Sequence, residues 1–120
     1  MSNNDIPLAA RALAVFHQPP LKLNCAQAVA HAWQAAVGKD DPSQIAALKA
    51  CGGGRAPGGT CGALHAAQLV LAETGGDPAA LSQGFADRHN HLTCQELKRH
   101  GVSCAACVAT ACELLASDGT

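Results

Sequence analysis

Aromatic residues are scarce in this chain of 120 residues, which has two Phe, one Trp and no Tyr. An interior with so few rings must be filled by smaller side chains. Hydrophobic residues make up 48% of the chain, and alanine supplies more of them than any other residue. We therefore expect a thin core of closely approaching helices, large enough to stabilise one domain over residues 1–120.

An excess of positive charge is also lacking, because the formal net charge is −1. A chain without a basic patch interleaved with aromatics is not expected to bind nucleic acid or an anionic membrane surface. No stretch approaches the roughly 18 apolar residues that a membrane span needs. The polar start and an apolar run interrupted by Arg11 and His17 predict no signal peptide, so the expected compartment is the cytoplasm.

Cysteine, in contrast, is abundant, with seven residues. The odd number excludes complete disulfide pairing within one chain. In a reducing compartment, such a set indicates metal, cluster or redox chemistry more than structural disulfides.

A glycine-rich loop between Cys51 and Cys61 is the most distinctive stretch, with five of the twelve glycines inside it. We expect this loop to be irregular but ordered. Thr60 is a residue type that begins helices, and an apolar run follows it. The pattern predicts Thr60 as the N-cap and Cys61 in the first helical turn, where free N–H groups and the helix dipole favour a thiolate.

The same pairing of an N-cap residue type with a cysteine recurs at 24–25, 93–94 and 103–104. Gln27 and Glu96 lie three residues after the first two caps, which predicts capping boxes there. We therefore expect four thiols at helix starts to converge on one site: Cys25, Cys61, Cys94 and Cys104. Cys51, Cys107 and Cys112 lack this context.

Periodicity predicts an all-α fold, a compact bundle of about six or seven short helices around the glycine-rich loop. Trp33 is expected to be the main core aromatic, and His65, one turn after Cys61, is the best histidine for proton handling. The expected helices span residues 6–17, 25–37, 42–49, 61–74, 78–89, 94–99 and 104–116.

From about residue 20 onward, the chain resembles the C_GCAxxG_C_C family of redox-active proteins. The resemblance is carried by Asn24-Cys25-Ala26-Gln27-Ala28-Val29, by Thr60-Cys61-Gly62-Ala63-Leu64, and by the segments around Cys94 and Cys104. The second glycine of the motif is replaced by Ala66. A related domain in split-Soret cytochromes accompanies an iron–sulfur centre, which the resemblance implies as the type of cofactor here. No haem attachment motif is present.

The residues by themselves leave three classes of function open. The first is an electron-transfer protein with an iron–sulfur cluster, or zinc, on Cys25, Cys61, Cys94 and Cys104, with Cys51 as an additional ligand. The second is a cluster-free thiol–disulfide oxidoreductase, for which Cys104-x-x-Cys107 is the close pair. The third is a structural or metal-storage protein with cysteines as small hydrophobes. A redox partner protein and a homodimer are further expectations.

Overall fold

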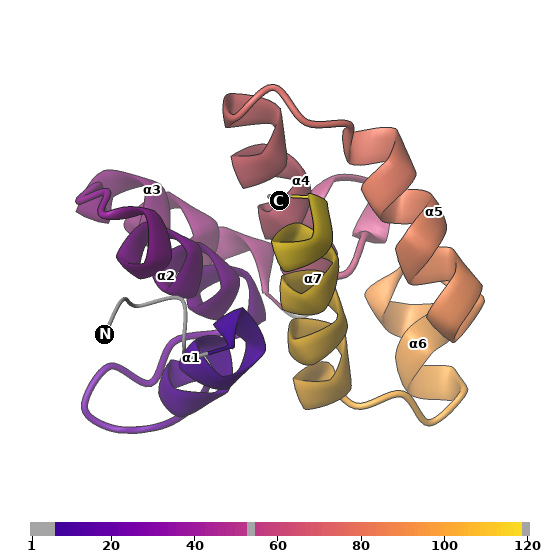
Figure 1. Cartoon of the computed structure of the whole chain (residues 1–120). Helices are drawn as coiled ribbons and strands as arrows, with labels where there is room; N and C mark the ends of the chain where they lie inside the picture. Colours follow the sequence, from indigo (N-terminus) through magenta and orange to yellow (C-terminus); the bar gives the residue numbers. More distant parts are fainter. Residues whose placement is uncertain (1–6, 53–54, 119–120) are drawn as a thin grey trace.

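The computed structural model describes residues 7–52 and 55–118, and helices account for most of this part of the chain (Figure 1). The described ranges contain no β-strand, only two isolated bridges. The all-α prediction is therefore confirmed. The α-helices are α1 (Leu8–Val15), α2 (Cys25–Val37), α3 (Pro42–Ala47), α4 (Gly62–Glu73), α5 (Pro78–His89), α6 (Cys94–Arg99) and α7 (Cys104–Asp118), with 3₁₀ turns at Leu48–Cys51 and Pro57–Gly59.

The first helix is shorter than the 6–17 range that the sequence predicts. Residue 6 lies outside the described residues. At the other end, Phe16 is extended and bridges Leu23, and the His17 N–H donates to the Leu23 carbonyl at 2.9 Å. The chain thus folds back across Pro19 and Pro20, and this pairing replaces the last helical turn.

The third helix also ends early, at Ala47, and continues as the 3₁₀ turn over Leu48–Cys51. The Asn24 side chain donates to the carbonyl of Lys49 at 3.0 Å and to that of Leu48 at 3.4 Å. These bonds tie the turn to the start of α2, so a contact between distant segments sets where the helix changes. Gly53 and Gly54 of the following loop lie outside the described residues.

The core lies where α1, α2, α4 and α7 pack against one another, with α5 against α4 and α7 (Figure 1). Small side chains fill it, as the composition predicts, and several are fully buried: Ala12, Ala26, Ala28, Ala30, Ala32, Ala63, Ala66 and Ala67. The radius of gyration is 12.9 Å, close to the roughly 13–14 Å of a compact domain of this length.

The expectation that Trp33 is the main core aromatic is wrong. Trp33 is only partly buried at the edge of the core, and the Lys39 amine lies 5.3 Å from the centre of its ring. Phe85 of α5 is instead fully buried and is the largest side chain of the interior. Spacing along α2 did not show that α5 would pack against α4 and α7 and place its phenylalanine in the interior.

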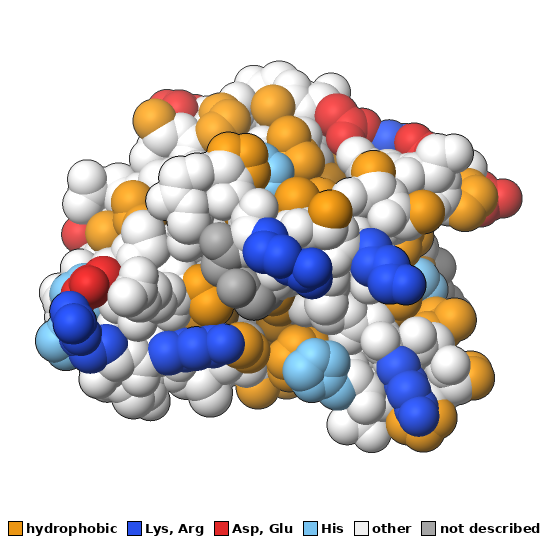
Figure 2. Space-filling model, turned by 180° about the vertical axis from the view of Figure 1, so that it is seen from behind, with side chains coloured by type: hydrophobic (Ala, Val, Ile, Leu, Met, Phe, Trp, Pro, Cys, Tyr) orange, Lys and Arg blue, Asp and Glu red, His pale blue; other side chains and the backbone are white. Residues whose placement is uncertain are grey.

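No helix within the described residues is long and apolar enough to cross a membrane. On the face shown in Figure 2, Lys and Arg side chains stand at separate positions, some of them beside Asp or Glu, and do not merge into one continuous patch.

Candidate functional site

Three of the four cap-adjacent cysteines are the first residues of helices, as predicted. The Asn24 side-chain oxygen accepts from the Gln27 N–H at 2.8 Å, and the Asn24 backbone N–H donates to the Gln27 side-chain oxygen at 3.2 Å, which completes a capping box before Cys25. The hydroxyl oxygen of Thr93 accepts from the Glu96 N–H at 3.3 Å, and that of Ser103 from the Ala106 N–H at 3.1 Å. Each cap leaves the following cysteine in the first turn, beside free backbone donors.

The start of α4 differs from the prediction, because Cys61 itself is the N-cap and Thr60 precedes it without a side-chain capping bond. Thr60 instead pairs with Thr93 in an antiparallel bridge, and the Cys61 N–H donates to the Leu92 carbonyl at 2.8 Å. This pairing pulls Thr60 out of the cap position. It also joins the start of α4 to the start of α6, so that Cys61 and Cys94 face the same space.

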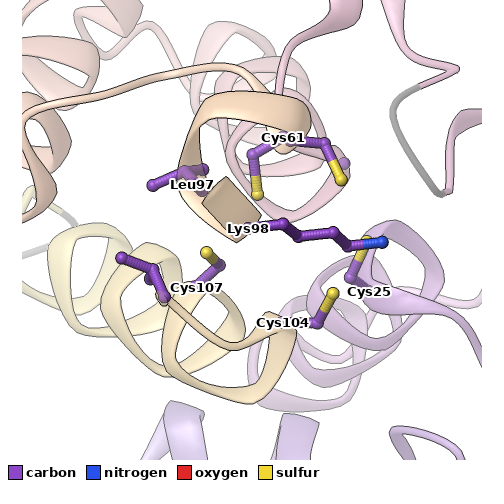
Figure 3. A pocket seen from close by; sticks show the side chains of 9 residues that line it. Cys25, Cys61, Leu97, Lys98, Cys104 and Cys107 are labelled. Atoms are coloured by element: carbon purple, nitrogen blue, oxygen red, sulfur yellow. The ribbon is translucent and has the colours of Figure 1, made fainter. Parts of the chain in front are cut away.

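All four of these thiols line one pocket between α2, α4, α6 and α7 (Figure 3). Cys107, which is one turn after Cys104 on α7, lines it as well. Sulfur atoms face the common space, and the Lys98 side chain extends across it from α6 toward Cys25. The complete lining is Cys25, Cys61, Gly62, Cys94, Leu97, Lys98, Val102, Cys104 and Cys107.

The pocket is narrow, with a volume of about 10 Å³, which is about what one water molecule needs. The described part of the chain has one group of three His, Cys, Asp or Glu residues whose ligand atoms all lie within 4.8 Å of one another, and it contains no cysteine. Thiolates on a single zinc lie roughly 3.8 Å apart, given bonds of about 2.3 Å. The thiols therefore share a pocket without being drawn together around a single ion.

The electrostatics of the pocket distinguish Cys61 from the other thiols. A hydrogen bond from the Cys107 thiol, followed by the N–H groups of Leu64 and Ala63, lowers the pKa of Cys61 to about 7 despite its burial. The same bond raises the pKa of Cys107 well above its ordinary value, because Cys107 is the donor. At neutral pH, Cys61 is thus partly a thiolate and Cys107 is a thiol.

Two further thiols are held neutral. Burial, followed by the nearby charges of Cys61 and Cys104, raises the pKa of Cys25 to about 11, against N–H bonds from Ala26 and Ala63. Burial also raises the pKa of Cys104, while the charge of Lys98 lowers it. Lys98 is the one charged amine in the lining, and it compensates negative charge that develops on the thiols.

The remaining sequence-based candidates lie elsewhere. Cys51 does not line the pocket; its backbone carbonyl packs against Gly62 instead. Cys112 of α7 is fully buried in the hydrophobic core of the protein. His65 is half-buried on α4, and the pocket lining contains no histidine. Sequence reasoning missed Cys107 and Lys98 as lining residues, although the Cys-x-x-Cys spacing at 104–107 was a signal that both thiols share a face of one helix.

A family model described as "Putative redox-active protein (C_GCAxxG_C_C)" matches residues 23–117. The chain belongs to this family. The match takes in every cysteine of the pocket, and α1 lies before it. No curated protein and no solved structure matches the chain.

The C_GCAxxG_C_C chain carries a donor set suited to a soft metal or a cluster. Five thiols and no carboxylate or imidazole line the pocket, and sulfur ligands favour zinc, copper(I) and iron–sulfur clusters. Several thiols stand at helix starts, whose N–H groups and dipoles stabilise negative sulfur. Cys94 and Cys104 are only half-buried at the rim, which leaves them free to turn toward a bound group.

Proposed function

We propose that this protein is an electron carrier whose pocket holds an iron–sulfur cluster through Cys25, Cys61, Cys94 and Cys104. The observation that carries the proposal is the convergence of these thiols, with Cys107, on one pocket that contains no other metal-ligating residue type. Iron–sulfur clusters are commonly held by four thiolates, and the family description names redox activity.

The chain's own residues would prepare the site in distinct ways. Cys61, whose pKa is lowered to about 7, would supply a thiolate at neutral pH. Cys25 and Cys104, whose pKa values are raised, release their protons as the group binds, which makes assembly pH-dependent. Lys98 offsets the accumulated negative charge, and Leu97 and Val102 limit contact with water.

A cluster held there would supply one-electron transfer, at a potential set by charge, hydrogen bonds to sulfur and solvent exposure. Cys94 and Cys104 are the half-buried thiols of the pocket lining, so an electron would take its shortest route to a redox partner protein on their side.

The decisive measurement is the iron, acid-labile sulfide and zinc content of protein purified without oxygen, together with its visible spectrum. A cluster gives brown protein with both iron and sulfide. Cys61→Ser should remove the colour, because a hydroxyl is a harder ligand than a thiolate. Colourless protein without iron and sulfide would refute the cluster, and zinc that is lost in Cys61→Ser would identify a zinc site on the thiols instead.

Cys112→Ala is the matched control. Cys112 is also a buried cysteine of the chain, but it lies in the core of α7 away from the pocket lining. This variant should keep the iron, the sulfide and the colour. If Cys112→Ala loses the cluster as completely as Cys61→Ser, the effect is one of folding, and the assignment of Cys61 as a ligand fails.

The hydrogen bond between Cys61 and Cys107 favours a second candidate, a cluster-free thiol–disulfide oxidoreductase. The Cys61 thiolate would attack a disulfide of a partner protein, forming a mixed disulfide and releasing one partner thiolate. Cys107, after losing its proton, would attack the Cys61 sulfur and release the second partner thiolate. The protein ends with a Cys61–Cys107 disulfide, and two electrons have passed to the partner.

Metal-free protein tests this second candidate through the pH dependence of alkylation by iodoacetamide, read at Cys61 by mass spectrometry. The rate should rise through about pH 7, the pKa of Cys61. Cys107→Ala removes the donor and should move that rise to higher pH. If the pH dependence of Cys61 alkylation is unchanged in Cys107→Ala, the Cys61–Cys107 pair loses its basis. If protein purified without oxygen contains iron and sulfide, the cluster is favoured over the oxidoreductase.

A further inference from the structure

A second group of metal-binding side chains lies on α6 and the loop before it, outside the cysteine pocket. One ligand atom each of His91, Glu96 and His100 lies within 4.8 Å of the other two. The rings of His91 and His100 stack with centres 4.2 Å apart and planes inclined by only 13°. Nε2 of His100 is 3.8 Å from a carboxylate oxygen of Glu96.

Local structure explains why these side chains meet. Glu96 and His100 are four residues apart, so they project from one face at the end of α6. His91 follows Asn90, whose left-handed backbone conformation (φ 66°) ends α5 and turns the chain back. The Thr93 cap fixes the Glu96 backbone, and the His100 N–H closes the helix on the Glu96 carbonyl at 3.1 Å.

The competing contacts of this group are weak. The Glu96 carboxylate accepts from Arg99 at 3.2 Å, but the Arg99 side chain is 67% exposed and an ion pair this open contributes little. The Glu96 and His100 side chains are 39% and 53% exposed. Each can therefore turn by the small amount that a shared ion requires without disturbing the core.

We infer that His91, Glu96 and His100 form a binding site for a divalent transition metal ion of the zinc type. Two imidazoles and one carboxylate are ligands that zinc takes in proteins, at bonds of about 2.0–2.2 Å. Such bonds place ligand atoms roughly 3.4 Å apart, whereas the present ones lie within 4.8 Å of one another, so binding would draw them together by up to about 1.4 Å and turn the two stacked imidazoles until their nitrogen lone pairs meet at the ion. Three protein ligands leave a fourth position on the ion for water or another small ligand.

This site is separate from the proposed cluster, because it uses no thiol. The two nonetheless share α6, which carries Cys94, Leu97 and Lys98 toward the pocket and Glu96 and His100 on another face. An ion here would link the loop at His91 to the C-terminal end of α6. Metal at the histidines would thereby hold the part of the pocket wall that α6 supplies.

The test is a zinc titration of the full-length protein, monitored by two-dimensional NMR of the imidazole groups. This measurement gives separate resonances for the six histidines and does not report directly on thiol ligands. The resonances of His91 and His100 should shift together. Glu96→Gln and His100→Ala should each raise the zinc concentration at the midpoint for His91 by about 100-fold, since even an indirect change near a metal ligand costs about 10–100-fold.

His31→Ala and Glu113→Gln are the matched controls, because both residues lie outside the group. The midpoint should be unchanged in both, and far-ultraviolet circular dichroism should show native helix content in every variant. The proposal is overturned if excess zinc leaves the His91 and His100 resonances in place, or if His31→Ala weakens the response as much as His100→Ala. Either result leaves the cluster proposal untouched.

Discussion

Gly62 packs directly against the thiol of Cys25. A Cβ atom at Gly62 would lie 2.7 Å from Cys25 Sγ and 2.8 Å from the backbone carbonyl oxygen of Cys51. Both separations are shorter than any stable contact, and the second involves a backbone atom that cannot turn away. The absence of a side chain at the first residue of α4 is therefore what lets α2 and α4 bring Cys25 and Cys61 to one pocket.

Gly62→Ala should accordingly displace Cys25 and destabilise the fold by about 1–3 kcal/mol, the usual cost of overpacking. Gly84→Ala on α5 is the matched control, because its Cβ would meet only a Leu114 methyl group at 3.0 Å. Alanine also favours the helix by up to about 1 kcal/mol. Chemical denaturation measures the free energy of unfolding of both variants. Equal stabilities of the two variants would contradict the close approach of Gly62 to Cys25.

Asn24→Ala should lower the free energy of unfolding by about 2–4 kcal/mol. The side chain caps α2, which is worth about 1 kcal/mol, and it also binds the carbonyls of Leu48 and Lys49, each worth about 0.5–1.5 kcal/mol. Asp77→Ala removes a cap that bonds only to Ala79 and Ala80 of its own helix, so it should cost about 1 kcal/mol. Urea denaturation of both variants checks the difference.

Stability should fall as the pH rises above 9, and Cys112 should account for part of the fall. Burial raises the pKa of Cys112 from 9.0 to about 12. Between these values the unfolded chain releases the proton and the folded chain keeps it, so rising pH favours unfolding by on the order of 1 kcal/mol per pH unit. The free energy of unfolding of Cys112→Ala should depend less steeply on pH above 9. Parallel curves for variant and wild type would refute this.

Phe85→Ala should cost about 3–5 kcal/mol, because the ring is fully buried and its removal leaves a cavity. Trp33→Ala should cost clearly less, although tryptophan is the larger residue, because its ring is only partly buried. Thermal and urea unfolding of the two variants rank them directly. The reverse order would restore Trp33 as the main core aromatic.

Local rules determined much of this protein from the sequence. Cap residues, prolines and glycines act within a few residues, so the start of α2 after Asn24, its end at Gly38 (φ 75°) and the span of α6 follow from neighbouring side chains alone. The scarcity of large side chains likewise required alanines in the interior. The grouping of Cys25, Cys94 and Cys104 as first residues of helices came from the same local information.

Contacts between distant segments decided the rest. Thr60 left the cap of α4 because it pairs with Thr93. The chain after α3 continues as a 3₁₀ turn because the Asn24 side chain binds the carbonyls of Leu48 and Lys49. Cys107 lines the pocket and Cys51 does not, because the packing of α7 and α4 decides which cysteines meet there. No local sequence pattern encodes this packing. The thiol with the lowered pKa is Cys61 because Cys107 donates to it, and a hydrogen bond across 46 positions exists only once the helices have packed.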